Sequence, residues 1–195
     1  VAATVTVAVK ELEAAGAVIV DVSLPSTDLG VSTYYVIAPA EASANLSRYD
    51  GVRYGYRCDS PSNLQDLYLR SRTEGFGEEV KRRILIGTFT LSAASYDQYF
   101  MKAQQVRRLI AEEYQSVLED VDVIAGPSAP NTAFVLNDDS KSITDMYMED
   151  VFTIGANLAG LPAISVPAGL VNGLPVGMQP VSYTHLRAHE TSRYR

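Results

Sequence analysis

Residues 148–169 read MEDVFTIGANLAGLPAISVPAG, and the fold is interpreted outward from this stretch. Its first part predicts a helix, because apolar residues recur there at helical spacing. Gly160 can take the left-handed conformation that ends a helix, and Pro162 prevents the helix from continuing. Residues 163–166 then predict a short buried strand. Asp150 stands in the first half of the predicted helix, where its carboxylate is either a solvated charge that favours the helix dipole or an anion aimed into a site.

Helices and strands are predicted to alternate along the rest of the chain. Val5, Val9 and Leu12 lie on one helical face, and Gly16 ends that helix. This alternation predicts an α/β fold with a mixed, mostly parallel sheet flanked by helices, in one domain over residues 1–180. The sequence further predicts helices at 34–46, 63–71, 78–91 and 96–120, strands at 17–24, 121–125 and 174–179, an ordered loop at 48–61, a rigid bend at 126–130 and a polar loop at 137–142.

Several of these helices carry local signals. Pro39 has no N–H to donate, so we expect it in an early turn or at a kink of its helix. Thr144 or Asp145 is the expected N-cap of the helix that contains Asp150. Because the chain begins inside a helix–strand unit without a start methionine, we expect upstream sequence to be missing. One face of the helix 78–91 should be buried, since it carries Ile84, Leu85, Ile86 and Phe89.

The composition limits the classes of protein that the chain can represent. With 195 residues, 47% of them hydrophobic, the chain can form a sizeable core. No apolar run reaches the roughly 18–20 residues that a membrane span needs, and the N-terminus shows no signal-peptide pattern. Cys58 is the single cysteine, which excludes an internal disulfide and indicates a reducing, cytoplasmic compartment. The formal net charge of −7 argues against binding a polyanion through general electrostatics.

Residues 181–195 read VSYTHLRAHETSRYR and lack the apolar periodicity of the rest. They resemble a tail found on unrelated gene-derived proteins in which sequencing-adapter bases have been translated, so we expect a non-native tail. His185 and His189 could place two metal ligands on one side of a helix, but no third ligand lies nearby in sequence. Residues 1–180 contain no histidine, which excludes a Ser-His or Cys-His nucleophile within them.

Three kinds of side chain could together bind a zwitterion such as a free amino acid. Arg83 could pair with a carboxylate, or its charged end could stay in water while only its stem is covered. Asp150 could hold an ammonium group, and Tyr34 or Tyr35 could offer a hydroxyl. Cys58 has no evident activating partner, and neither a phosphate-binding glycine loop nor a pair of carboxylates stands out. The sequence therefore shows candidate binding groups without a nucleophile.

Several long strings resemble the C-terminal portion of the amidase-signature family, and within it the tRNA-dependent amidotransferases. The resemblance covers nearly all of residues 1–179. The strings are RYDGVRYGYR (48–57), SRTEGFGEEVKRRILIGTFTLS (71–92), VDVIAGPSAP (121–130), NLAGLPAISVPAG (157–169) and NGLPVGMQ (172–179).

This resemblance implies an amidase in which a serine, activated through a bridging cis-serine and a lysine, forms an acyl-enzyme and releases ammonia from glutamine. In the amidotransferases, ATP and Mg are used by a partner subunit, which converts Glu-tRNA(Gln), or Asp-tRNA(Asn), with that ammonia; subunits B and C complete a heterotrimer. The lysine and the glycine- and serine-rich signature do not occur in this sequence. We therefore expect that the N-terminal catalytic half is missing, that the chain has no catalytic residue, and that it is inactive alone.

The resemblance also implies a glutamine site. Tyr34 in TYYVIAPAEAS, Arg83 in KRRI and Asp150 in MYMED match the family's glutamine-binding residues. Arg83 would hold the α-carboxylate, Asp150 the α-ammonium group, and Tyr34 would orient the ligand, with Tyr35 as the alternative to Tyr34. Two other interpretations stay open. One is an amidase-signature hydrolase for another amide, which would need the Arg83–Asp150 pair less, and the other is a non-catalytic binding or assembly piece.

Overall fold

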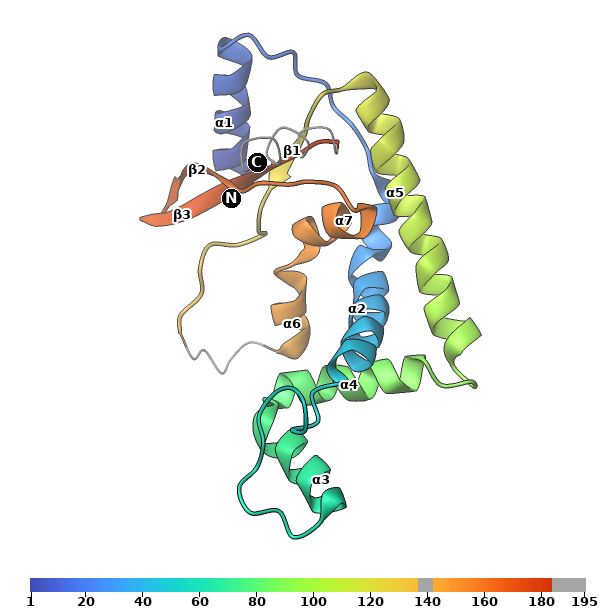
Figure 1. Cartoon of the computed structure of the whole chain (residues 1–195). Helices are drawn as coiled ribbons and strands as arrows, with labels where there is room; N and C mark the ends of the chain where they lie inside the picture. Colours follow the sequence, from blue (N-terminus) through green and yellow to red (C-terminus); the bar gives the residue numbers. More distant parts are fainter. Residues whose placement is uncertain (137–141, 184–195) are drawn as a thin grey trace, which may run out of the picture. The chain divides into compact units, whose positions relative to one another are not determined.

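The computed structural model describes residues 1–136 and 142–183 (Figure 1). The chain forms two compact units, one made of Val1–Val31 with Val106–Arg195 and the other of Ser32–Gln105. Most of the predicted loop 137–142 falls outside the described residues, as do both histidines. The helices are α1 (Ala2–Ala14), α2 (Gly30–Leu46), α3 (Leu64–Gly75), α4 (Glu78–Thr90), α5 (Lys102–Asp120), α6 (Ile143–Met148) and α7 (Val151–Ala159), with a 3-10 helix at Pro25–Leu29 and a π-helix at Tyr96–Met101; the strands are β1 (Ile124–Pro127), β2 (Val166–Val171) and β3 (Leu174–Val181).

The sheet of the first unit has the strand order β1-β3-β2, and both neighbouring pairs are antiparallel. Asn172 and Gly173, which join β2 to β3, have φ values of 52° and 80°. Positive φ at both positions is what a two-residue hairpin turn of type I′ requires. β1 pairs with the far end of β3, where Ile124 lies opposite Val181. The mixture of helices and strands is confirmed, but the predicted parallel pairing is not seen within the described residues.

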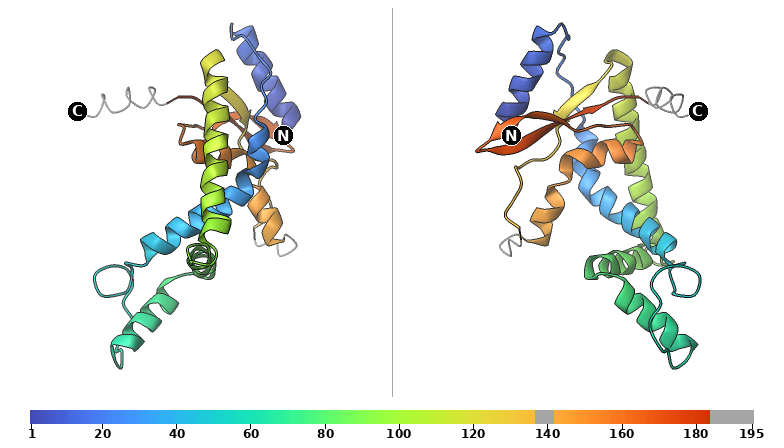
Figure 2. Two further views of the ribbon diagram at one scale, coloured as in Figure 1. Left: turned by 90° about the vertical axis from the view of Figure 1, so that its right-hand side faces the viewer. Right: turned by 60° about the vertical axis from the view of Figure 1, so that its left-hand side comes forward.

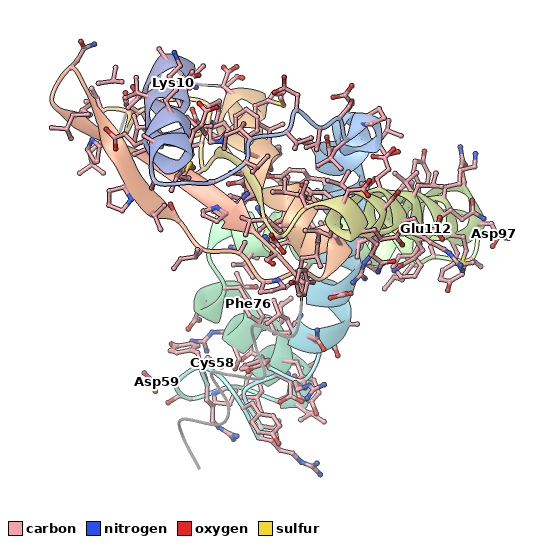
Figure 3. The ribbon with its side chains drawn as sticks, turned by 90° about the horizontal axis from the view of Figure 1, so that it is seen from above. Lys10, Cys58, Asp59, Phe76, Asp97 and Glu112 are labelled. Atoms are coloured by element: carbon pink, nitrogen blue, oxygen red, sulfur yellow. The ribbon has the colours of Figure 1, made fainter. Side chains whose placement is uncertain are left out.

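Helix α1 packs against the hairpin formed by β2 and β3 (Figure 2). Val5 of α1 forms a buried cluster with Val176 and Met178 of β3, and each of them is at most 7% exposed. Lys10 is exposed on the same helix (Figure 3). Leu12 was predicted to share the buried face but is 43% exposed. The apolar face of α1 is therefore covered over its first two turns.

Helices α5 and α7 pack closely where Gly155 meets Tyr114. A Cβ atom on Gly155 would lie 2.5 Å from the Tyr114 hydroxyl oxygen, so a larger residue there would require the Tyr114 ring to shift. Burial raises the pKa of Tyr114. Arg107 Nε donates to the backbone carbonyl of Leu158 at 3.0 Å, which satisfies one of the last carbonyls of α7. Gly160 has φ 72° and ends the helix as predicted.

In the second unit, α2 and α4 approach at Pro39 and Gly87. A Cβ atom on Gly87 would lie 1.9 Å from the carbonyl oxygen of Pro39, so only glycine fits there. Ser43 lies one turn after Pro39 and Thr88 directly follows Gly87, and Ser43 Oγ and Thr88 Oγ1 are hydrogen-bonded at 2.9 Å. Pro39 lies inside α2 and is fully buried, which corrects the expectation of an early turn. The predicted buried face of α4 is wrong as well, since Leu85, Ile86 and Phe89 are exposed.

The loop between α2 and α3 is ordered as predicted. Arg72 Nη1 donates to the carbonyl oxygens of Leu46 and Tyr49 at 2.9 and 3.0 Å, which fastens the start of the loop to α3. Cys58 is 3% exposed, and its backbone N–H donates to Ser71 Oγ at 3.1 Å (Figure 3). A backbone N–H buried in this way needs such a partner. Cys58 is therefore a packed residue of the loop.

The predicted strand at 17–24 is wrong. These residues have no strand pairing, and Val18 and Val20 are 89% and 57% exposed. Their β-branched composition favours an extended backbone, but a strand also needs a neighbour for its N–H and C=O groups. Among residues 1–136 and 142–183, none pairs with this segment. The segment therefore forms no strand of the sheet.

Other boundaries also differ from the predictions. The strand predicted at 163–166 begins only at Val166. Ala163 pairs with Val181 in an isolated bridge that is not part of this strand. β1 lies three residues later than predicted at its start and includes part of the predicted bend. Val181, placed in the tail by the sequence, belongs to β3, and Ser182 Oγ donates to the carbonyl of Asp122 at 2.7 Å. The fold therefore continues past residue 180.

Candidate functional site

The candidate site begins where α4 faces α2. α4 starts after Gly77, and Glu78 and Glu79 in its first turn are favoured by the helix dipole. Arg83 stands one turn before Gly87, on the same side of α4. Because Gly87 lets α2 approach closely, the side chain of Arg83 reaches the N-terminal half of α2.

The guanidinium of Arg83 is held from two sides. Its Nη1 donates to the hydroxyl of Tyr34 at 2.9 Å, and its Nε donates to Oε1 of Glu79 at 3.0 Å. The Arg83 side chain is 28% exposed. Partial burial alone would lower the pKa of Arg83, but the hydrogen bonds to Tyr34 and Glu79 outweigh burial and raise it. The guanidinium is therefore a cation whose Nε and Nη1 are held by hydrogen bonds.

Two tyrosine rings lie beside this cation. The Cζ atom of Arg83 lies 5.9 Å from the ring centroid of Tyr34 and 5.5 Å from that of Tyr35. The two rings meet edge to face with centroids 4.9 Å apart. The hydroxyl of Tyr35 is buried, whereas that of Tyr34 contacts the guanidinium. Of the two alternatives, Tyr34 is the one whose hydroxyl meets Arg83.

Asp150 belongs to the first unit and lies between two helices. The expected helix start is wrong, because Ser142 caps α6 in a reciprocal capping box with Asp145. Asp150 takes the N-cap position of α7 and makes no side-chain cap hydrogen bond. Its backbone carbonyl accepts from the N–H and the hydroxyl of Thr153, both at 3.0 Å. The carboxylate of Asp150 is exposed and is not needed to cap α7, so it can bind a cation.

Comparisons with known proteins identify the family. The model of the family described as Amidase matches residues 1–184. The chain belongs to the amidase family. This match confirms the resemblance to the amidase-signature family that the sequence segments indicated. The matched range also includes Val181 and Ser182.

Two curated relatives of this amidase chain share a name. The chain is 62% identical over 172 residues to the A subunit of glutamyl-tRNA(Gln) amidotransferase from Alcanivorax borkumensis, covering 88% of this chain and 35% of that protein. It is 58% identical over 179 residues to the protein of the same name from Nitrosococcus oceani, covering 92% and 37%. The amidase chain thus spans about a third of the length of the curated relatives it matches.

Solved amidase structures agree in fold. The crystal structure of the glutamyl-tRNA(Gln) amidotransferase A subunit from Thermotoga maritima matches with a TM-score of 0.65 and 46% identity, covering 92% of this chain and 34% of that one. A crystal structure of an amidase matches with a TM-score of 0.68 at 22% identity, covering 92% and 37%, and supports the fold alone.

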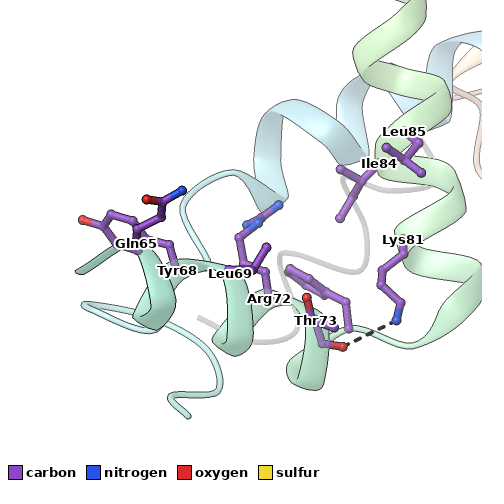
Figure 4. A pocket seen from close by; sticks show the side chains of 9 residues that line it. Gln65, Tyr68, Leu69, Arg72, Thr73, Lys81, Ile84 and Leu85 are labelled. Carbon is purple, nitrogen blue, oxygen red and sulfur yellow. Dashed lines mark hydrogen bonds between the residues drawn. The ribbon is translucent and has the colours of Figure 1, made fainter. Parts of the chain in front are cut away.

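Two cavities lie within single units of the amidase chain. One, of about 460 Å³, lies between α3 and α4, and Lys81 at its edge donates to the carbonyl of Thr73 at 3.5 Å (Figure 4). Its walls are mostly apolar, with Leu69 and Leu85 on opposite sides. The other, of about 260 Å³, lies in the first unit beside Gly155 and Gln179. Neither of these two cavities is lined by Tyr34 or Arg83.

Sequence reasoning missed Glu79. It stands four residues before Arg83, a spacing at which oppositely charged side chains meet on a helix, and this signal could have identified it. In the part of the chain that the structure describes, no group of three or more metal-ligating side chains could hold a metal ion. On α2 and α4 the structure brings Tyr34, Glu79 and Arg83 together through hydrogen bonds, whereas Asp150 belongs to the other unit.

Proposed function

We propose that this chain is part of the glutamine-hydrolysing subunit of a tRNA-dependent amidotransferase. The observation that carries the proposal is 62% identity over 172 residues to a protein named as the A subunit of glutamyl-tRNA(Gln) amidotransferase. The hydrogen-bonded pair of Tyr34 and Arg83 supports it, because a fixed cation beside a hydroxyl suits an amino-acid carboxylate. The reaction would release ammonia from glutamine and convert Glu-tRNA(Gln) to Gln-tRNA(Gln).

In this proposal Arg83, Asp150 and Tyr34 bind the substrate. Arg83 holds the α-carboxylate of glutamine with its remaining N–H groups, and Asp150 pairs with the α-ammonium group. The Tyr34 hydroxyl accepts one hydrogen bond from Arg83 and still has its own hydrogen to donate, so it can orient the ligand. A zwitterion bound by two opposite charges is fixed in direction, which presents its side-chain amide to the nucleophile.

The catalytic serine, the bridging serine and the lysine would be supplied by sequence outside this chain. A backbone oxyanion site, also outside, would stabilise the tetrahedral intermediate before ammonia leaves. We further propose a cytoplasmic heterotrimer with subunits B and C, in which a partner subunit uses ATP and Mg to activate the aminoacyl-tRNA. The chain by itself would be inactive.

Glutamine hydrolysis by the full-length protein tests this proposal. Wild type should hydrolyse glutamine, and Arg83→Ala or Asp150→Ala should raise KM by roughly tenfold to 100-fold, because each removes one charge-assisted contact with the substrate. Lys10→Ala, which removes an exposed cation on α1, serves as the control and should leave KM unchanged. If the full-length protein ignores glutamine while cleaving other amides, or if both variants keep the wild-type KM, the proposed glutamine site is wrong.

A further inference from the structure

The position of Arg83 depends on a second carboxylate from its own helix. Glu79 Oε1 accepts from Arg83 Nε at 3.0 Å, and the second oxygen, Oε2, lies 2.5 Å from Nη1 of Arg82. The Glu79 side chain is therefore fixed at both oxygens. Arginine has many rotamers, and holding Nε removes most of this freedom, because Nε lies at the root of the guanidinium fork.

The contacts leave part of the guanidinium available for a ligand. A guanidinium carries five N–H donors in one plane. Among the residues that the structure describes, Glu79 and Tyr34 each accept one hydrogen bond from Arg83, through Nε and Nη1. The two terminal nitrogens keep enough N–H groups to bind both oxygens of a carboxylate. The direction in which these groups point is set at Nε by Glu79 and at Nη1 by Tyr34.

We propose that Glu79 is a positioning residue of the glutamine site, which turns the free end of the Arg83 guanidinium toward the α-carboxylate of the substrate. This inference rests on the proposed function, in which Arg83 binds that carboxylate. Glu79 acts through Arg83 and does not touch the substrate. Since a negative charge on Glu79 would repel the substrate carboxylate, its favourable contribution is geometric, through the hydrogen bond that it accepts from Arg83 Nε.

The adjacent residue Glu78 provides a matched comparison. Glu78 pairs with Lys81 at 2.5 Å, yet its side chain is 87% exposed, whereas that of Glu79 is 44% exposed. An ion pair as exposed as the one formed by Glu78 contributes little to stability. Glu78 and Glu79 are thus both glutamates in the first turn of α4. Only Glu79 pairs with Arg83.

The experiment uses the full-length protein and two substrates. L-Glutamine carries the α-carboxylate, and 4-aminobutanamide is the same molecule without it. Steady-state kinetics are compared for wild type, Arg83→Ala, Glu79→Ala, Glu79→Gln and Glu78→Ala. For glutamine we expect Glu79→Ala to raise KM by roughly tenfold with little change in kcat, since a displaced cation weakens substrate binding. Glu79→Gln keeps an oxygen that accepts from Nε and should restore KM to within about threefold of wild type.

Each outcome has one meaning. Preference for glutamine over 4-aminobutanamide should fall in Glu79→Ala and stay in Glu78→Ala, because only the first moves the group that recognises the carboxylate. The inference is overturned if Glu79→Ala keeps the wild-type KM, if Glu79→Gln is as impaired as Glu79→Ala, or if both substrates lose activity equally. If wild type does not hydrolyse glutamine, or if Arg83→Ala keeps the wild-type KM, the proposed function itself fails. If Glu79→Ala keeps the wild-type KM while Arg83→Ala raises it, only this inference is overturned.

Discussion

The hydroxyl of Tyr56 donates to Oε2 of Glu74 at 2.8 Å and so ties the loop before α3 to the end of that helix. This hydrogen bond is the largest cause that lowers the pKa of Glu74, and the hydrogen bond from Arg70 also lowers it. Because the pKa is lower in the folded state, the stabilising effect is present above the unfolded-state value of about 4.3 and is lost as pH falls through the folded-state value. We expect Tyr56→Phe to raise the pKa of Glu74 toward its ordinary value, as measured by carboxyl NMR titration.

Tyr54 supplies the control for this measurement. It is 56% exposed in the same loop and packs against the ring of Tyr49. Tyr54→Phe should leave the Glu74 titration unchanged. A Glu74 pKa that is the same in wild type and Tyr56→Phe would show that the tyrosine does not hold this carboxylate in solution.

Single residues of the candidate site could be predicted only in part. The strings around Tyr34 and Arg83 identify both positions, but their hydrogen bond joins residues 49 positions apart. That contact depends on how α2 passes α4, and no local pattern encodes this. The pairing of Glu79 with Arg83 could have been predicted from their spacing of four residues, but it was not. Asp150 was expected inside a helix, whereas the capping box at Ser142 starts a separate short helix before it.

At the scale of elements, the approach of α2 to α4 depends on Gly87. Alanine there would gain up to about 1 kcal/mol of helix propensity, but its Cβ would lie 1.9 Å from the Pro39 carbonyl oxygen. We expect Gly87→Ala to destabilise the protein by about 1–3 kcal/mol net, because the backbone must move apart. Thermal unfolding measures the effect. Gly126→Ala is the control, since an added Cβ meets nothing within 4 Å there; a Gly87→Ala protein with a raised Tm would contradict the close approach.

Helices were predicted more accurately than strands, for a physical reason. The ends of α3 and α4 follow local signals such as the Asn63 cap, whose side chain accepts from the N–H of Asp66, and the break at Phe76 and Gly77. A strand exists only where another strand satisfies its backbone, and this partner is not visible in the segment itself. Residues 17–24 have the composition of a strand without such a partner, so their prediction failed.

At the scale of the whole molecule, the sheet direction could have been predicted better. The alternation of helices and strands favoured parallel pairing, yet Asn172-Gly173 is the strongest short-range signal for a two-residue hairpin. Two strands joined in this way must be antiparallel. The amidase family could be recognised from short sequence segments alone, because each segment matches the family at many consecutive positions.

The end of the fold gives a prediction for the whole chain. The sequence placed the end at residue 180, but Val181 is 3% exposed and pairs with Ile124. Ser182 makes two further hydrogen bonds, from its N–H to the Pro162 carbonyl at 3.2 Å and from Oγ to the Asp122 carbonyl at 2.7 Å. Deleting residues 185–195 should leave Tm unchanged, because the family match ends at residue 184 and these contacts remain.

Deleting residues 181–195 should instead lower Tm by more than about 4 °C, since it removes a buried valine and two hydrogen bonds that join β3 to its neighbours. Thermal unfolding of both truncated proteins beside the full chain measures the difference. Ser182→Ala separates the causes, because it removes only the Oγ contact and should lower Tm by a smaller amount. Equal Tm values for the two truncations would mean that the end of β3 contributes nothing, and the fold would then end where the sequence placed it.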